Sequence, residues 1–297
     1  MPELPEVEVI RRRLLERLPG LMVREVVVND ATVSEQSEAE LRRLLAGRRV
    51  VNLRRRGKYL LVDLGAPGGP RRVADPPAGA SPAAASSNAA ATIAVIHLRM
   101  TGQLLIDPQP ATRPPRFVWR FEPPAELHFQ DVRRFGRLWA FAPAAEHDFF
   151  AARGMGPEPF GPDFTVAYLR EQLRGRRAPL KAFLIDQRRL AGVGNIYADE
   201  ALFRARLHPL RAAGSVGPRE ALRLHAAVLE TLQAGIDHEG SSIESFVDPA
   251  GARGGFQEIL NVYQRAGEPC RVCGTAIART VVGGRGTHYC PHCQRRR

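Results

Sequence analysis

The sequence predicts an α+β protein built from several domains, and three observations support this prediction. Short apolar runs, often alternating with polar residues, fill much of the first half of the chain and are typical of β-strands. In the second half, apolar residues recur every three or four positions, which indicates amphipathic helices. Four cysteines stand together near the carboxyl end and suggest a metal-stabilised module. A chain of 297 residues is also long enough for about two domains with buried cores.

The composition favours a partner that carries negative charge. Lys and Arg number 43 against 31 Asp and Glu, which leaves a formal net charge of +12. Such an excess is expected of a protein that works against nucleic-acid phosphates. No apolar run approaches the roughly 18 residues of a membrane span, and charges interrupt the amino-terminal segment where a signal peptide would be apolar. We therefore expect a cytoplasmic protein that binds nucleic acid and no membrane.

The predicted amino-terminal domain, residues 1–150, begins with one helix and continues with strands. Apolar residues recur at helical spacing from Val7 to Leu18, and Pro19 and Gly20 end the run. The short runs that follow predict a β-sandwich or a barrel. The expected strands cover residues 22–28, 50–53, 59–64, 93–98, 104–106, 117–121, 127–129 and 138–141.

Composition sets the remaining predicted boundaries. Residues 65–91 contain ten Ala, five Pro, four Gly and three Ser, so we predict a disordered insertion that lacks the large apolar side chains needed to pack. Gly and Pro punctuate a predicted linker at 151–162, which leads to a helical domain at 163–262 and a final module at 263–297. The expected helices lie near residues 163–174, 179–188, 195–206 and 218–236.

The final module has the spacing of a zinc site. Its two Cys-x-x-Cys pairs, sixteen residues apart, are Cys270 with Cys273 and Cys290 with Cys293. Four thiolates can surround one Zn²⁺ ion tetrahedrally, and because sulfur fills every position we expect a structural ion. Two strand-like runs joined by residues 283–286 predict a zinc ribbon whose hairpin tip presents Arg285. Arginines in the module favour contact with phosphates over docking onto another protein.

The amino terminus offers a nucleophile. Methionine before proline is normally removed, which would leave Pro2 with a secondary amine at the start of a helix. The positive helix end disfavours an ammonium ion, so the pKa of this amine should lie below the usual α-amino value of about 7.7–8.0. Such an amine attacks aldehyde carbons, and Glu3 could carry the proton. Taken alone, however, Pro-Glu-x-Pro is more often just a stable helix start.

Several motifs in one order resemble bacterial formamidopyrimidine-DNA glycosylase. They are residues 1–8 (MPELPEVE), 58–60 (KYL), 97–102 (HLRMTG), 133–136 (RRFG), 192–197 (GVGNIY) and the four cysteines. The resemblance covers the chain apart from 65–91. It implies a monomeric glycosylase and lyase of base excision repair that removes 8-oxoguanine and formamidopyrimidines from duplex DNA. The implied architecture is an amino-terminal β-sandwich, a helix-two-turn-helix domain and a zinc finger with one structural Zn²⁺.

The resemblance also assigns residues that fill the gap left by an extruded nucleotide. An enzyme that takes a base out of the stack needs such wedges and a donor for the orphaned partner base. Met100, Arg133 and Phe135 match the family's void-filling residues, with Phe135 as a wedge and Arg133 bonded to the orphaned cytosine. Taken singly, Met100 or Phe135 would more often belong to a core.

Three further residues match groups that hold the phosphates around the lesion: Lys58, Asn195 and Arg285. The alternative for Lys58 is a solvated charge on a hairpin, and for Asn195 a plain helix N-cap. In the mechanism that the resemblance implies, Pro2 attacks C1′ while Glu3 assists opening of the sugar ring. Lys58 and Arg285 then take part in β- and δ-elimination. Glu6 could position the base or the helix start.

Two alternatives stay open at this point, and three residues depart from the family pattern. An endonuclease VIII-type glycosylase for oxidised pyrimidines shares the fold and the Pro-Glu start, and a non-catalytic DNA-binding protein could use the same helices and ribbon. The departures are Arg99 for a common glycine, Val132 for a proline and Gly255 for an aromatic residue. Arg99 could add a phosphate contact or alter the geometry of the wedge. Gly255 bears on the preference between 8-oxoguanine and ring-opened purines.

Overall fold

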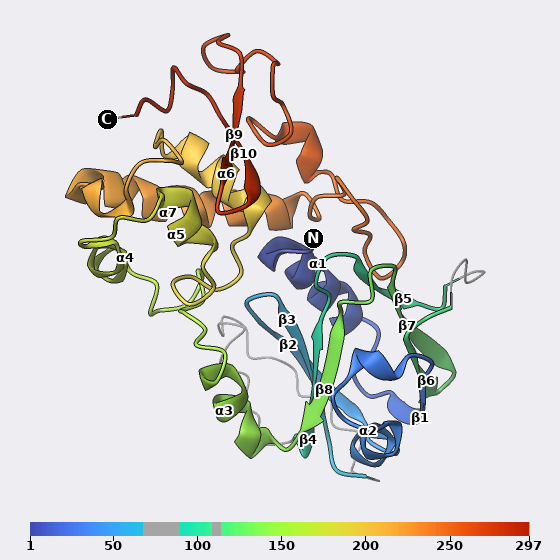
Figure 1. The fold of residues 1–297 in the computed structure, drawn as a ribbon. Coiled ribbons are helices and arrows are strands. Elements are labelled where there is room, and N and C mark those ends of the chain that lie inside the picture. The colour runs from blue at the N-terminus through green and yellow to red at the C-terminus, as the bar shows by residue number, and fades with distance from the viewer. Residues whose placement is uncertain (68–89, 109–113, 297) are drawn as a thin grey trace. The chain divides into compact units, whose positions relative to one another are not determined.

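The computed structural model describes residues 1–67, 90–108 and 114–296, and it confirms the predicted mixture of helices and sheets (Figure 1). The chain divides into two units. One unit contains Met1–Ala152 and Glu239–Gly255, and the other contains Arg153–His238 and Phe256–Arg297. Most of the predicted insertion at 65–91 lies outside the described residues.

Two antiparallel four-stranded sheets form the body of the first unit, and every strand predicted there is present. One sheet has the order β1 (Met22–Val28), β6 (Phe117–Glu122), β7 (Ala125–Asp131) and β5 (Gly102–Ile106). The other has the order β2 (Val50–Arg56), β3 (Tyr59–Leu64), β4 (Thr92–His97) and β8 (Arg137–Phe141). Several observed strands are longer than predicted because polar residues at their ends also pair.

Side chains from both sheets and from helix α1 (Leu4–Leu15) share one apolar core, which confirms the predicted β-sandwich. Val7, Ile10 and Leu14 of the helix are fully buried in it, as their helical spacing requires. Trp119 and Phe129 are among the largest side chains that it encloses. This core holds the helix whose first residues are candidates for the chemistry.

Two short helices of the first unit were not predicted. Helix α2 (Glu38–Leu45) starts at Ser37, whose hydroxyl accepts the amide of Glu40, and it buries Leu41 and Leu45 one turn apart. A serine N-cap before leucines at helical spacing was the signal for it. Helix α3 (Glu146–Ala151) has no side-chain cap and no buried residue, so its sequence carries a weaker signal.

The second unit contains the expected helices and the hairpin of the cysteine module. Its main elements are α4 (Val166–Leu173), α5 (Leu180–Ile185), α6 (Asn195–Arg204), α7 (Pro218–Asp237), β9 (Ala278–Val282) and β10 (Arg285–Tyr289). Gly235 lets α7 approach α6, because a Cβ there would lie 2.3 Å from Cε1 of Tyr197. No helix within the described ranges is long and apolar enough to cross a membrane.

The position of Arg285 differs slightly from the prediction. The tip of the hairpin consists of Gly283 and Gly284, both with positive φ, as two-residue hairpin turns require. Arg285 is therefore the first residue of β10, paired with Val282, and its side chain is exposed directly after the turn.

Candidate functional site

The start of helix α1 is buried although it carries polar groups. Pro2 is buried, and Glu3 is only 1% exposed. The Glu6 carboxylate accepts the amide of Glu3 at 2.7 Å, so it satisfies one of the amides that a helix start leaves unbonded. The terminal ammonium of Met1 lies 3.0 Å from an oxygen of Glu244. Pro2 itself is packed at the positive end of the helix, independently of the Met1 contact.

Residues 239–255 follow α7 in the chain and form a loop of the first unit. Hydrogen bonds hold this loop against the start of helix α1. Glu6 uses its other carboxylate oxygen to accept the amide of Ser241 at 2.9 Å. Ser242 donates to the carbonyl of Phe246 and accepts the amide of Gly254. Position 254 must be glycine, since a Cβ would come within 2.3 Å of two carbonyl oxygens. The expectation that Glu6 positions the helix start agrees with these contacts.

Lys58 lies in the turn between β2 and β3. Gly57 has a φ of 56°, which lets the chain reverse here. The Lys58 side chain is only 7% exposed, so it is not a charge that simply projects into solvent. Its ammonium is thus held close to the protein surface beside the chain reversal, a position compatible with a role in binding or chemistry.

Two loops of the first unit bring together the three residues predicted to fill a gap in DNA. Residues 97–102 join β4 to β5, and residues 131–136 join β7 to β8. Thr101 links them, because its hydroxyl donates to Asp131 and accepts the amide of Arg133 at 3.1 Å. Asp131 also accepts the amide of Gly136 at 2.7 Å, which closes the second loop on itself. The two loops therefore hold each other in place.

The side chains at the ends of these loops are exposed. Phe135 is 49% exposed, Arg133 is exposed and Met100 is partly buried, so Phe135 is not a core residue. The guanidinium carbon of Arg133 lies 5.0 Å from the centre of the Phe135 ring, a cation–π contact. An apolar wedge and a five-donor cation thus stand side by side.

Asp30 holds the side chain of Arg134, the residue that follows Arg133 in the chain. Arg134 donates to both carboxylate oxygens of Asp30, at 2.8 and 2.9 Å, and Arg116 donates to the same group at 2.8 Å. These bonds, that of Arg134 above all, hold the pKa of the Asp30 carboxyl well below its usual range. Arg134 is engaged within the protein, whereas Arg133 presents its guanidinium outward.

In the second unit, a buried ion pair supports the hairpin that carries Arg285. Lys181 and Asp199 lie 2.7 Å apart, and both side chains are 0% exposed. Lys181 also donates to the carbonyl of Gly286 and to the hydroxyl of Thr287, each at 2.9 Å. Sequence reasoning missed this pair. The signal was a lysine inside the apolar run of residues 180–185, which a solvent-facing side chain does not explain.

Asn195 belongs to the same support. It is the first residue of α6, and Gly194 holds the N-cap position, so the N-cap alternative is wrong. The Asn195 amide donates to the carbonyl of Gly286 at 3.1 Å. Its buried carbonyl oxygen has no hydrogen-bond partner among the residues that the structure describes. The amide nitrogen also donates to the hydroxyl of Tyr263 at 3.4 Å, so both of its protons are directed at the protein.

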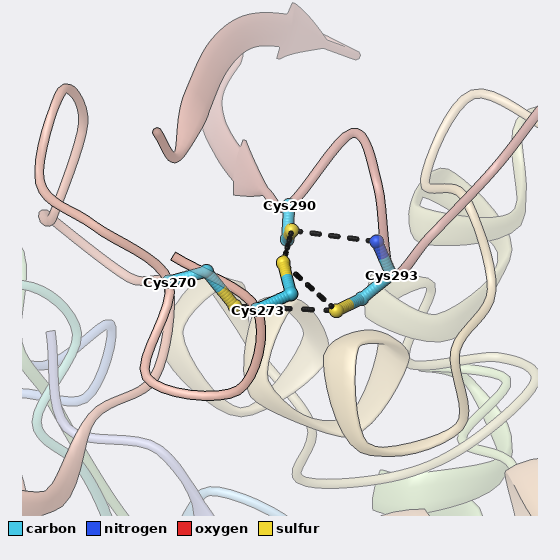
Figure 2. A group of neighbouring side chains, drawn as sticks. All are labelled: Cys270, Cys273, Cys290 and Cys293. Atoms are coloured by element: carbon cyan, nitrogen blue, oxygen red, sulfur yellow. Dashed lines mark hydrogen bonds between the residues drawn. The ribbon is translucent and has the colours of Figure 1, made fainter. Parts of the chain in front are cut away.

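The four cysteines gather at one point, as Figure 2 shows, and their ligand atoms all lie within 4.8 Å of one another. The sulfur of Cys273 lies 3.5 Å from those of Cys290 and Cys293, and Cys270 lies 4.0 Å from Cys293. Four sulfurs at about 2.3 Å from one ion, in tetrahedral geometry, lie at comparable separations. The donor set fits one structural Zn²⁺, as predicted.

The predicted residues fall in both units. The first unit contains Pro2, Glu3, Lys58, Met100, Arg133 and Phe135, and the second contains Asn195, Arg285 and the four cysteines.

Family models match three successive parts of the chain. The model of the formamidopyrimidine-DNA glycosylase N-terminal domain matches residues 1–138, and that of the formamidopyrimidine-DNA glycosylase H2TH domain matches 155–247. The model of a zinc finger found in FPG and IleRS matches 267–296. A relative from Pelotomaculum thermopropionicum, named formamidopyrimidine-DNA glycosylase, is 40% identical over 298 residues, which cover 99% of both chains.

Solved structures with the same fold contain damaged DNA. A variant of the Lactococcus lactis FPG in complex with DNA that contains Fapy-dG has a TM-score of 0.86 and 31% identity. A MutM protein bound to DNA with carbocyclic 8-oxo-G has a TM-score of 0.85 and 32% identity. In both cases the match covers 99% of this chain and 100% of the other.

Proposed function

This chain belongs to the formamidopyrimidine-DNA glycosylase family, and we propose that Pro2 is the nucleophile with which it releases oxidised purines from duplex DNA. The chain is a DNA glycosylase and lyase of base excision repair. The observation that carries the proposal is the buried helix start, where Glu6 orders the amide of Glu3 beside Pro2. Solved relatives are bound to the purine lesions Fapy-dG and carbocyclic 8-oxo-G, which supports this substrate class, and a Lactococcus lactis FPG is also bound to DNA that contains an oxidised pyrimidine.

The chemistry starts when removal of Met1 frees the Pro2 nitrogen. Its lone pair forms a bond to C1′ of the lesion nucleotide, and the glycosidic electrons leave with the base. Glu3 supplies a proton to the ring oxygen as the sugar opens, which gives an iminium ion. That cation acidifies the C2′ proton, so the 3′-phosphate leaves by β-elimination and the 5′-phosphate by δ-elimination. Hydrolysis of the imine then returns the free amine.

The paired loops of the first unit would replace the extruded nucleotide. Phe135 is already exposed and would enter the stack, with Met100 on the adjoining loop filling the space of the lost base. Arg133 would bond the orphaned cytosine, because the Asp30 pair leaves Arg133, and not Arg134, to face outward.

Phosphate contacts would come from Lys58 in the first unit and from Asn195 and Arg285 in the second. Lys58 is buried at a tight turn, and Arg285 is exposed on a hairpin that Lys181 supports. Charged and amide donors of this kind position DNA without reading its sequence. We assign Lys58 and Arg285 also to proton transfer in the two eliminations.

The zinc site sets a condition on the compartment. Zn²⁺ binds thiolates, so the four cysteines must stay reduced. We place the protein in the bacterial cytoplasm, where thiols stay reduced and the nucleoid DNA is accessible.

Borohydride trapping tests the proposal. A duplex with 8-oxoguanine opposite cytosine is incubated with enzyme and borohydride, which reduces an imine to a stable covalent adduct. Wild-type enzyme should form the adduct, whereas enzyme whose Pro2 nitrogen is blocked by acetylation should lose it while still binding a tetrahydrofuran-containing duplex. Pro5→Ala, at the same helix start, is the matched control and should still be trapped. Undiminished trapping by the acetylated enzyme would remove Pro2 from the chemistry. If the wild type were trapped only on duplexes that contain oxidised pyrimidines, the substrates would be oxidised pyrimidines and not oxidised purines.

A further inference from the structure

We propose that Arg99 contacts a backbone phosphate of the bound duplex, beside the point where Met100 enters it. The inference rests on the proposed function, because it takes duplex DNA as the ligand of loops 97–102 and 131–136.

The backbone at Arg99 adopts a conformation that a side chain makes unfavourable. Its φ is 56°, in the left-handed region, where the Cβ crowds the following carbonyl group. Glycine adopts this conformation freely. Other residues keep it only where the surrounding structure holds them, and such residues cluster at functional sites.

Arg99 lacks the ion pair that Arg134 forms in the loop of residues 131–136. Arg134 also has a left-handed backbone, with a φ of 58°, but its guanidinium forms the two-bonded ion pair with Asp30. The guanidinium of Arg99 is exposed and has no hydrogen-bond or ion-pair partner in the described part of the chain. The guanidinium of Arg99 is therefore available to an external group.

The loop holds Arg99 ready for such a ligand. The backbone amide of Arg99 donates to Nδ1 of His97 at 3.0 Å. His97 is itself buried and packs edge-on against Tyr59, with ring centres 4.4 Å apart. On the other side, Thr101 ties the loop to Asp131. A rigid loop with an exposed cation loses little entropy on binding.

A phosphate is the group that best matches this cation. In the proposed complex Met100 fills the space of the lost base, beside Phe135 from the other loop. Arg99, the preceding residue, then lies at the edge of the duplex, where phosphates line both strands. A guanidinium binds phosphate oxygens through charge-assisted hydrogen bonds.

Salt-dependent binding tests this inference. The probe is a duplex with tetrahydrofuran opposite cytosine, which cannot be cleaved, and affinity is measured from about 50 to 250 mM salt. The slope of log K against log salt is negative, and loss of one phosphate contact should reduce its magnitude by about 0.9. The affinity should fall by about 3–10-fold near 0.1 M salt. Arg99→Ala and Arg99→Gly should both show these changes, and Arg99→Lys should recover most of the affinity. Arg43→Ala removes another exposed arginine, on α2, and should leave the slope unchanged.

Thermal melting distinguishes the effect of the lost side-chain charge from the effect of the left-handed backbone conformation. Arg99→Ala keeps a Cβ in the left-handed conformation and Arg99→Gly does not, so the glycine variant should melt about 1–3 °C higher. Wild-type slopes for both the alanine and the glycine variants would overturn the phosphate contact. An unchanged slope with altered preference for the base opposite the lesion would also overturn it, in favour of a base contact. Failure of the wild type to form the borohydride adduct concerns the proposed function instead.

Discussion

At the scale of single residues, one carboxylate decides which of two adjacent arginines is held within the protein. Arg133 and Arg134 are identical in the sequence, and no spacing rule separates them. Asp30, far away in the chain, binds Arg134 through two hydrogen bonds, and Arg133 turns to the ring of Phe135. The sequence favoured Arg133 only through family resemblance, because the distant partner of Arg134 is a property of the fold.

Replacing Asp30 should therefore destabilise the protein in a pH-dependent way. Asp30→Asn removes the charge shared by Arg134 and Arg116 and should cost about 1–3 kcal/mol of unfolding free energy at pH 7. The folded-state pKa of Asp30 lies below its unfolded value of about 3.9, so its contribution is complete above that pH and fades as the pH falls further. Urea unfolding of both proteins at pH 7 and pH 3 checks this. A difference that grows on acidification would contradict the assignment.

At the scale of elements, the sequence predicted what alternation and periodicity encode. All eight strands of the sandwich and the four main helices of the second unit follow their apolar patterns. Helix α2 escaped prediction because it is short and its buried face consists of only Leu41 and Leu45. The buried ion pair that supports the zinc hairpin was not predicted, because Lys181 and Asp199 lie on different helices and only the folded chain brings them together. Long-range polar pairs leave little trace in local patterns.

That buried pair gives an element-scale prediction. Lys181→Met leaves the carboxylate of Asp199 buried without its cation, and should lower the unfolding free energy by about 3–5 kcal/mol. The double change Lys181→Met with Asp199→Leu removes both charges and should recover much of the stability. Chemical denaturation of the single and double variants measures this coupling.

The double variant also tests how the hairpin works. It lacks the bonds from Lys181 to Gly286 and Thr287, so the hairpin should hold Arg285 less firmly. We expect weaker binding of the tetrahydrofuran duplex even where stability has recovered. Wild-type affinity in a stable double variant would show that the support serves folding alone.

At the scale of the whole molecule, the two units carry different tasks. The candidate nucleophile and wedges belong to the first unit, and the zinc site and Arg285 belong to the second. No zinc ligand contributes to the sandwich core. The match to the amino-terminal family model ends at residue 138 and that to the zinc finger begins at residue 267, whereas the H2TH match, 155–247, extends into the segment 239–255 of the first unit.

This division predicts that loss of zinc disables DNA binding without unfolding the sandwich. Cys290→Ser should release the ion and lower affinity for the tetrahydrofuran duplex at least tenfold, because the hairpin loses its fold and Arg285 its position. The chain has two tryptophans, Trp119 and Trp139, and both are buried in the first unit. Their fluorescence therefore reports the sandwich alone. Its emission maximum should stay unchanged and its thermal midpoint should stay within about 2 °C, because the apolar area that sets the stability of this core is untouched. A large drop in that midpoint would mean that the units depend on each other for folding, and retained zinc would mean that three thiolates suffice to hold it.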